Sequence, residues 1–215
     1  MPLIKLNAQS ATALDATKLT GNLPAISGAS LTGVSSDFVL IKSITASNDA
    51  QVQFINGSSG VVIDSTYKQY IIKAYNITSS ANGETYFAFR ESGSFQNTNY
   101  ARIYFRLNRT SGADGTAHSS SWTDGTAGIR LEHNYTGQSP KATNYEIIIN
   151  NPDHSTLLTS CMFHTWGANQ ESEDRFQGIR GGAYYRNNGN AVDGFQFDHS
   201  GGNLYGTFSL YGVKA

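Results

Sequence analysis

Cysteine and charged residues are scarce in this chain of 215 residues. The single cysteine, Cys161, excludes an intrachain disulfide and a cysteine-rich zinc site. Charged residues make up 14%, and 15 Lys and Arg against 16 Asp and Glu give a net charge of -1. This balance lacks the broad positive field that a phosphate backbone requires, so we expect no nucleic-acid partner.

Long apolar runs are missing as well. No stretch approaches the roughly 18 to 20 apolar residues that span a bilayer, so we expect no membrane insertion. Residues 1–10 lack the apolar core of a secretory signal, which predicts a soluble chain that starts at Met1. Without disulfides, stability must come from packing or assembly.

The polar residues that are present are mostly uncharged. The chain contains 24 Ser, 19 Thr, 18 Asn and 22 Gly, with 12% aromatic residues. Aromatic and β-branched residues among many turn formers favour an all-β protein. The length suits one compact domain with an extension.

Residues 1–37 contain no aromatic side chain and differ in composition from the remainder. Sparse leucines lie among Ala, Ser, Thr and Gly, and the sequence Leu-Thr-Gly at 19–21 recurs at 31–33. Glycine and Pro24 interrupt helical periodicity, which predicts extended chain with turns. We interpret this stretch as a fibre-type docking segment that packs against copies of itself or another protein, with a disordered tail as the alternative. The expected assembly residues are Leu14, Leu19, Leu23, Ile26 and Leu31.

Residues 38–215 contain about ten short strand-like runs divided by turn clusters, and no amphipathic segment of helical length. This spacing predicts an antiparallel β-sandwich of the jelly-roll kind. The first two runs, 38–44 and 51–55, read as a strand pair.

One run alternates with a period of two. Its two arginines share one side, which predicts a strand with one buried and one solvent-exposed side. The alternating sets are Ala101, Ile103, Phe105 and Leu107 against Arg102, Tyr104, Arg106 and Asn108.

The longest turn-rich stretch is 108–128, in which Asp-Gly-Thr-Ala at 114–117 recurs at 124–127. A loop of about twenty residues inside a compact domain is unusual unless it contacts something. We therefore expect an exposed loop that forms a contact surface.

Both ends of the chain resemble virion structural proteins of tailed bacteriophages. LDATKLTGNLPAISGASLTGV at 14–34 looks like the leucine, glycine and threonine motifs of tail fibres, and GFQFDHSGGNLYGTFSLYGVKA at 194–215 is similar to the closing strand pair of phage fibre domains. The resemblance implies a homotrimeric appendage assembled in the bacterial host cytoplasm and joined to other virion proteins. It names no particular appendage, since such modules occur in tail fibres, head fibres and capsid decoration.

Candidate binding residues are aromatic. Neutral glycans are bound by stacking on aromatic faces and by amide and hydroxyl groups, with few charges. Tyr184, Tyr185 and Arg186 precede a polar turn, and Trp122 lies in the long loop. The alternative is that the two tyrosines point to opposite faces of a strand, while Trp122 holds the loop down. Trp166, in an apolar run, is expected in the core, as is Cys161.

Catalytic patterns are weak, so we expect no enzyme, cofactor or metal. Glu171, Glu173 and Asp174 cluster in what looks like a solvated turn, and the five histidines lack the spacing of a metal site. The leading hypothesis is a virion appendage that attaches to host glycan through weak, multivalent contacts. The alternatives are a purely structural head-fibre, adaptor or capsid-decorating protein and, least favoured, a polysaccharide-degrading enzyme.

Overall fold

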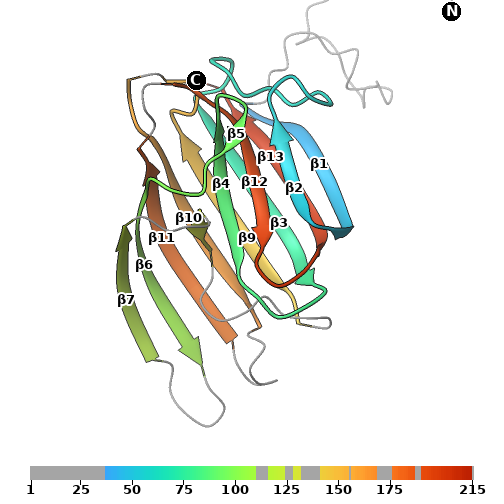
Figure 1. The fold of residues 1–215 in the computed structure, drawn as a ribbon, viewed down its shortest axis with the longest axis vertical. Coiled ribbons are helices and arrows are strands. Elements are labelled where there is room, and N and C mark those ends of the chain that lie inside the picture. The colour runs from blue at the N-terminus through green and yellow to red at the C-terminus, as the bar shows by residue number, and fades with distance from the viewer. Residues whose placement is uncertain are drawn as a thin grey trace, which may run out of the picture. The chain divides into compact units, whose positions relative to one another are not determined.

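A computed structural model describes residues 37–109, 116–123, 128–131, 141–154, 156–168, 176–186 and 190–214. All regular secondary structure in these ranges is β-strand. The described residues contain no helix that is long and apolar enough to cross a membrane. The strands pair antiparallel in two sheets, which confirms the predicted all-β sandwich (Figure 1). In chain order they are β1 (Phe38–Asp49), β2 (Gln51–Ile55), β3 (Gln69–Ser79), β4 (Thr85–Glu91), β5 (Ser94–Phe95), β6 (Tyr100–Arg109), β7 (Thr116–Thr123), β8 (Ile129–Arg130), β9 (Thr143–Asn150), β10 (Thr159–Ala168), β11 (Phe176–Tyr185), β12 (Val192–His199) and β13 (Leu204–Val213).

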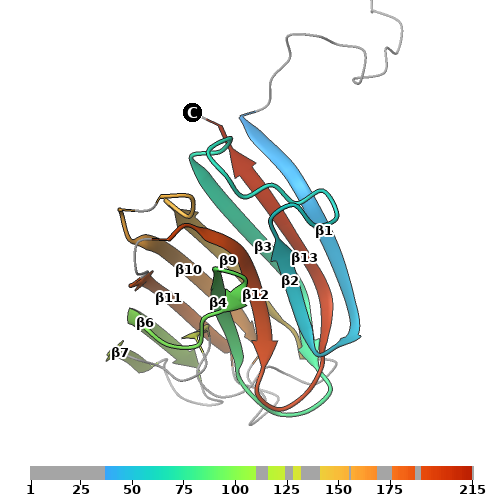
Figure 2. The same cartoon turned by 45° about the horizontal axis from the view of Figure 1, so that its top comes forward.

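The two sheets differ in width. The larger has eight strands in the order β1-β13-β3-β9-β10-β11-β6-β7. The smaller has five, in the order β2-β12-β4-β5, with β8 also paired to β4. In both ribbon views β2 and β12 lie over the part of the larger sheet that runs from β1 to β9, and most of β6 and β7 extends beyond the smaller sheet (Figures 1 and 2). The start of β6 is covered, because the ring centroid of Tyr100 lies 6.0 Å from that of Phe89 in β4.

Aromatic side chains fill the space between the sheets. Phe197 of β12 pairs across the smaller sheet with Phe87 of β4, and their ring centroids are 5.3 Å apart. The same ring lies 4.9 Å from Phe208 of β13 and 6.3 Å from Tyr145 of β9, both in the larger sheet. All four side chains are fully buried. Phe197 therefore joins the two layers, and burying a ring of this size contributes about 1.5–3 kcal/mol.

Two pairings expected from the sequence are wrong. β1 and β2 lie in different sheets, and so do β12 and β13, whose segment resembles a closing strand pair. Near the end of β1, Asn48 has a φ of 71° and interrupts the register with β13, and the Asp49 carboxylate accepts a hydrogen bond from the Ser47 N–H at 2.8 Å. Only Ala50 then separates β1 from β2. Short turns here connect layers instead of closing hairpins, a difference that strand spacing does not encode.

Strand β6 has one buried and one exposed side, as its alternation predicts, but the arginines are on the buried side. Arg102 is 8% exposed and Tyr104 is also buried, whereas Ile103 is 66% exposed. The Arg102 guanidinium donates to the backbone carbonyl of Arg130 in β8, so the long side chain reaches across to the smaller sheet. The apolar side of β6 therefore faces solvent.

The expected long loop contains a strand. Residues 116–123 form β7, which pairs with β6 from Asn108 opposite Thr116 to Ala101 opposite Thr123. Its sequence, TAHSSSWT, has no apolar alternation, so the periodicity that identifies strands was absent. Residues 110–115 and 124–127 lie outside the described ranges.

The core between the two sheets and the exposed side of β6 should differ in sensitivity to truncation. We expect Phe197→Ala to lower the free energy of unfolding by about 3–5 kcal/mol, because it leaves a cavity between the layers. Phe105→Ala, on the exposed side of β6, should cost about 1 kcal/mol or less. Urea unfolding followed by tryptophan fluorescence measures both, and equal losses would contradict the orientation of β6 described above.

His199, the last residue of β12, is buried beside the turn that crosses between the sheets. Its Nδ1 atom accepts a hydrogen bond from the Gly201 N–H at 3.2 Å. Burial lowers the pKa of His199 from its ordinary 6.5, opposed in part by the backbone of Gly83 and by Asp198 and Glu84. The folded protein therefore favours neutral His199.

This lowered pKa predicts a pH-dependent stability. As the pH falls through 6.5, the unfolded chain takes up the proton at this position before the folded chain does, so the free energy of unfolding decreases. In His199→Gln this part of the pH dependence should disappear, whereas His154→Gln, at an exposed histidine, should retain it. Urea titrations at several pH values between 5 and 8 measure the difference, and parallel curves for wild type and His199→Gln would refute the assignment.

Candidate functional site

Strand β11 places its two terminal tyrosines on opposite faces of the larger sheet. Tyr185 is 1% exposed, and its ring centroid lies 5.2 Å from that of Tyr100 in the core. Its hydroxyl donates to the buried Glu91 carboxylate, whose other oxygen accepts from Asn190 at 2.9 Å. Burial, and next the bond to Glu91, raise the pKa of Tyr185. Tyr185 is a core residue and cannot contact a ligand at the surface, contrary to its selection as a binding residue.

Tyr184 and Arg186 remain together at the surface. Tyr184 is 37% exposed, and the Arg186 Cζ lies 5.8 Å from its ring centroid, within the range of a cation–π contact. The backbone N–H of Arg186 donates to the Asn99 carbonyl at 2.9 Å, which fixes the end of β11 against the start of β6. The pair forms a small aromatic and cationic surface at one end of the sheet.

Trp122, the remaining predicted binding residue, lies in β7 opposite Arg102 of β6. The position of its indole ring lies outside what the structure describes. The predicted docking residues Leu14, Leu19, Leu23, Ile26 and Leu31 also lie outside the described residues, so their role in assembly stays a prediction.

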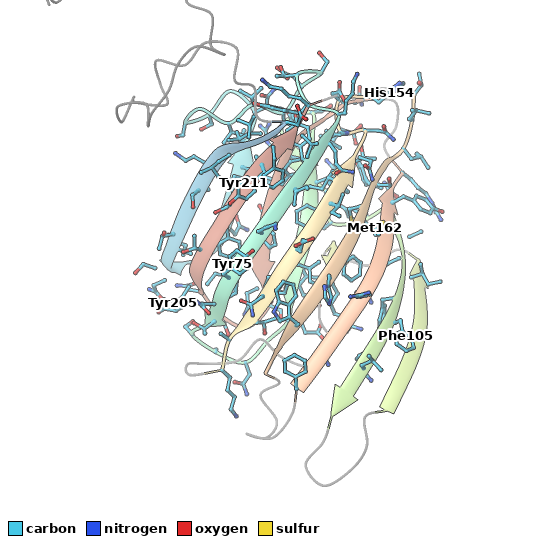
Figure 3. All side chains as sticks on the ribbon, turned by 180° about the vertical axis from the view of Figure 1, so that it is seen from behind. Tyr75, Phe105, His154, Met162, Tyr205 and Tyr211 are labelled. Atoms are coloured by element: carbon cyan, nitrogen blue, oxygen red, sulfur yellow. The ribbon has the colours of Figure 1, made fainter. Side chains whose placement is uncertain are left out.

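The outer face of the larger sheet, which points away from the smaller sheet, carries an apolar row across seven strands. Its members are register partners on successive strands, and Figure 3 shows Tyr211 and Met162 on this face. Met162 is 61% exposed. Contiguous exposed apolar side chains often mark a surface that contacts another molecule. The apolar row consists of Leu40, Tyr211, Ile71, Ile148, Met162, Gly182 and Ile103.

A polar row runs beside the apolar row. Lys73 and Glu146, partners in β3 and β9, form an ion pair of 3.6 Å. His164 follows in β10 and Arg180 in β11. Burial, and next the charge of Arg180, lower the pKa of His164, which therefore favours the neutral imidazole. The outer face thus combines apolar contact area with hydrogen-bonding groups and a low net charge.

Trp166 belongs to this outer face and not to the core, where its apolar run placed it. It alternates with buried Thr165 in β10, is partly exposed, and has its ring centroid 5.0 Å from that of His164. Its register partner in β11 is Gly178, where an added Cβ would meet nothing within 4 Å. An aromatic ring beside bare backbone is an arrangement that can receive a flat ligand face. Gly178 lies inside a strand-like run, and a glycine at such a position was the feature of the sequence that could have indicated this surface.

The described residues include no group of three or more His, Cys, Asp or Glu side chains that could hold a metal. Glu171, Glu173 and Asp174 lie outside the described ranges. Cys161 is buried, as expected, and burial raises the pKa of its thiol to about 12.

Comparison of the chain with family models, curated proteins and solved structures found no match.

The opposite placement of the two tyrosines can be tested by removing one hydroxyl at a time. Tyr185→Phe should lower the free energy of unfolding by about 1–3 kcal/mol, because the buried Glu91 carboxylate loses a donor. Tyr184→Phe should change it by less than about 0.5 kcal/mol, because that ring lies at the surface. Equal effects in urea unfolding would contradict the assignment of Tyr185 to the core.

Proposed function

We propose that this chain is a bacteriophage virion structural protein, a tail-fibre-type appendage that attaches the particle to the host surface. In this proposal it acts without catalysis, through weak contacts between the outer face of the larger sheet and host glycan. Two features support it: the resemblance of both chain ends to phage fibre motifs, and an exposed sheet face rich in aromatic and apolar side chains.

The outer face is the observation that carries the proposal. Tyr184 with Arg186, and Trp166 beside Gly178, offer aromatic surfaces, while His164 and neighbouring polar groups offer hydrogen-bond partners. Neutral sugars are recognised by this combination, because their C–H faces pack on rings and their hydroxyls pair with polar groups. The low charge of the chain fits a neutral ligand.

Multivalency supplies the strength that a single exposed face lacks. In a homotrimer, three weak sites could raise retention by about 10² to 10⁴ without a tight individual site. Residues 1–37 would join the trimer to other virion proteins, so the protein would reside in the virion after assembly in the bacterial host cytoplasm.

The alternative is a purely structural role, as a head fibre, an adaptor or a capsid-decorating protein. The continuous apolar row favours it, because a line of Leu, Ile and Met side chains suits a protein surface better than a sugar. An image of the particle labelled with an antibody to this chain would separate a tail position from a capsid position.

A glycan array and a host-cell pull-down test the attachment function. Tyr184→Ala and Arg186→Ala should each reduce the retained signal about tenfold or more, because loss of one weak contact is multiplied across the copies. Tyr184→Phe keeps the ring and should retain binding. Tyr75→Ala, at an exposed tyrosine of β3 on the same face, is the matched control (Figure 3).

Two results would oppose the proposal. Absence of signal for the wild type on glycans and host cells would favour the structural role. Equal losses of binding in Tyr75→Ala and Tyr184→Ala would show that the binding site is not at Tyr184 and Arg186. The mass in solution is measured on the same samples by light scattering, and a monomer at micromolar concentration would contradict the trimeric mechanism.

A further inference from the structure

The buried side of β6 carries two arginines in the part of the larger sheet that extends past the smaller one. Arg102 and Arg106 are on the same side of the strand, on either side of Tyr104. Successive same-side positions of a strand are about 6.6 Å apart, so the two backbone positions are separated by about 13 Å. This part of the interior differs from the aromatic core because it holds cations.

The surroundings of Arg102 explain how its charged side chain can be buried. Its guanidinium donates to the Arg130 carbonyl, and its Cζ lies 4.5 Å from the centroid of the Tyr104 ring. Burial, and next the charge of Arg130, lower its pKa to about 10, so it remains protonated at neutral pH. Arg102 is thus a fixed positive charge with a structural role.

Two of the three guanidinium nitrogens of Arg106 have no comparable partners among the described residues. Its Nε and Nη1 atoms are buried, and neither has a hydrogen-bond partner in the structure as described. Its register partner in β11 is Ile179, followed by Thr165 in β10, whose hydroxyl is already bonded to the Leu131 carbonyl at 2.9 Å. Buried guanidinium N–H groups without an acceptor are rare, because their desolvation is not compensated.

The carboxylate of Glu84, which interacts electrostatically with Arg102, accepts a hydrogen bond at each of its oxygens. Glu84 accepts from Arg130 at 2.8 Å through Oε1 and from the Tyr86 hydroxyl at 2.7 Å through Oε2. Neither Arg102 nor Arg106 takes part in the ion pairs found among the described residues, Lys73–Glu146, Arg90–Asp193 and Arg130–Glu84. Among the described residues, Arg102 interacts electrostatically with one further arginine, Arg130, and one carboxylate, Glu84, which leaves a net positive charge of one on these three side chains.

We propose that Arg106 binds an oxyanion, a carboxylate or a sulfate or phosphate group, through its unpaired Nε and Nη1 donors. A planar guanidinium presents two parallel N–H donors that match the two oxygens of such a group. The oxyanion supplies both the missing acceptors and the missing negative charge. The site lies on the opposite side of β6 from the outer face and does not depend on the glycan contacts proposed above.

The source of the oxyanion can be a free inorganic ion or an acidic sugar. Thermal unfolding of the full chain is therefore followed with sodium sulfate and, separately, sodium glucuronate, each against sodium chloride at equal ionic strength. We expect a saturable rise in Tm, about 5 °C at a hundredfold excess over Kd. A rise with both probes supports an oxyanion site in general, and a rise with glucuronate alone supports an acidic sugar.

Variants locate the effect. Arg106→Leu should abolish the saturable rise and leave only the linear increase that sulfate causes in any protein. Arg106→Lys keeps the positive charge but removes the planar donor pair, and it disturbs folding less than Arg106→Leu. It should weaken the apparent affinity about tenfold or more. Lys68→Leu removes one exposed positive charge outside both proposed sites and should behave as wild type.

The proposal is overturned by either of two results. One is the absence of a saturable rise with both probes in the wild type. The other is an unchanged saturable rise in Arg106→Leu, or in Arg106→Lys if the leucine variant does not fold.

Discussion

The contact of Phe197 with both sheets is the interaction on which the rest of the structure depends. The chain has no disulfide, and the three ion pairs of the described residues are partly exposed, so neither joins the layers strongly. Phe197 packs on Phe87 within its own sheet and on Phe208 and Tyr145 of the opposite sheet. These aromatic contacts set which part of the larger sheet is covered.

The unequal width of the sheets follows from that arrangement and produces both candidate surfaces. With β12 and β4 positioned over the middle strands, most of β6 and β7 extends past the smaller sheet (Figures 1 and 2). The side of β6 that faces the smaller sheet is therefore closed by long polar side chains such as Arg102, which reaches the backbone of β8. The opposite side is left with Ile103 and its apolar neighbours in solvent.

The two surfaces call for different chemistry. The outer face mixes aromatic and apolar side chains with polar groups, and it suits shallow contacts with neutral or apolar partners. On the other side of β6, Arg102 is held by a backbone carbonyl and an aromatic ring, whereas the buried Nε and Nη1 groups of Arg106 need an acceptor. Both surfaces involve β6, so the same ten residues contribute apolar contacts to one side and charge to the other.

Local composition was sufficient to predict the all-β class, the turn-separated strands and the burial of Cys161, because aromatic, β-branched and turn-forming residues act within a few positions of themselves. It also predicted that β6 has two unlike sides. Tertiary structure alone decided that the arginine side is the buried one, that β1 and β2 belong to different sheets, that TAHSSSWT is a strand, and that Tyr184 is exposed while Tyr185 is buried. These outcomes depend on which strands, distant in the sequence, pair with each strand or pack on it from the other sheet. Residue patterns along a single chain do not specify those long-range neighbours.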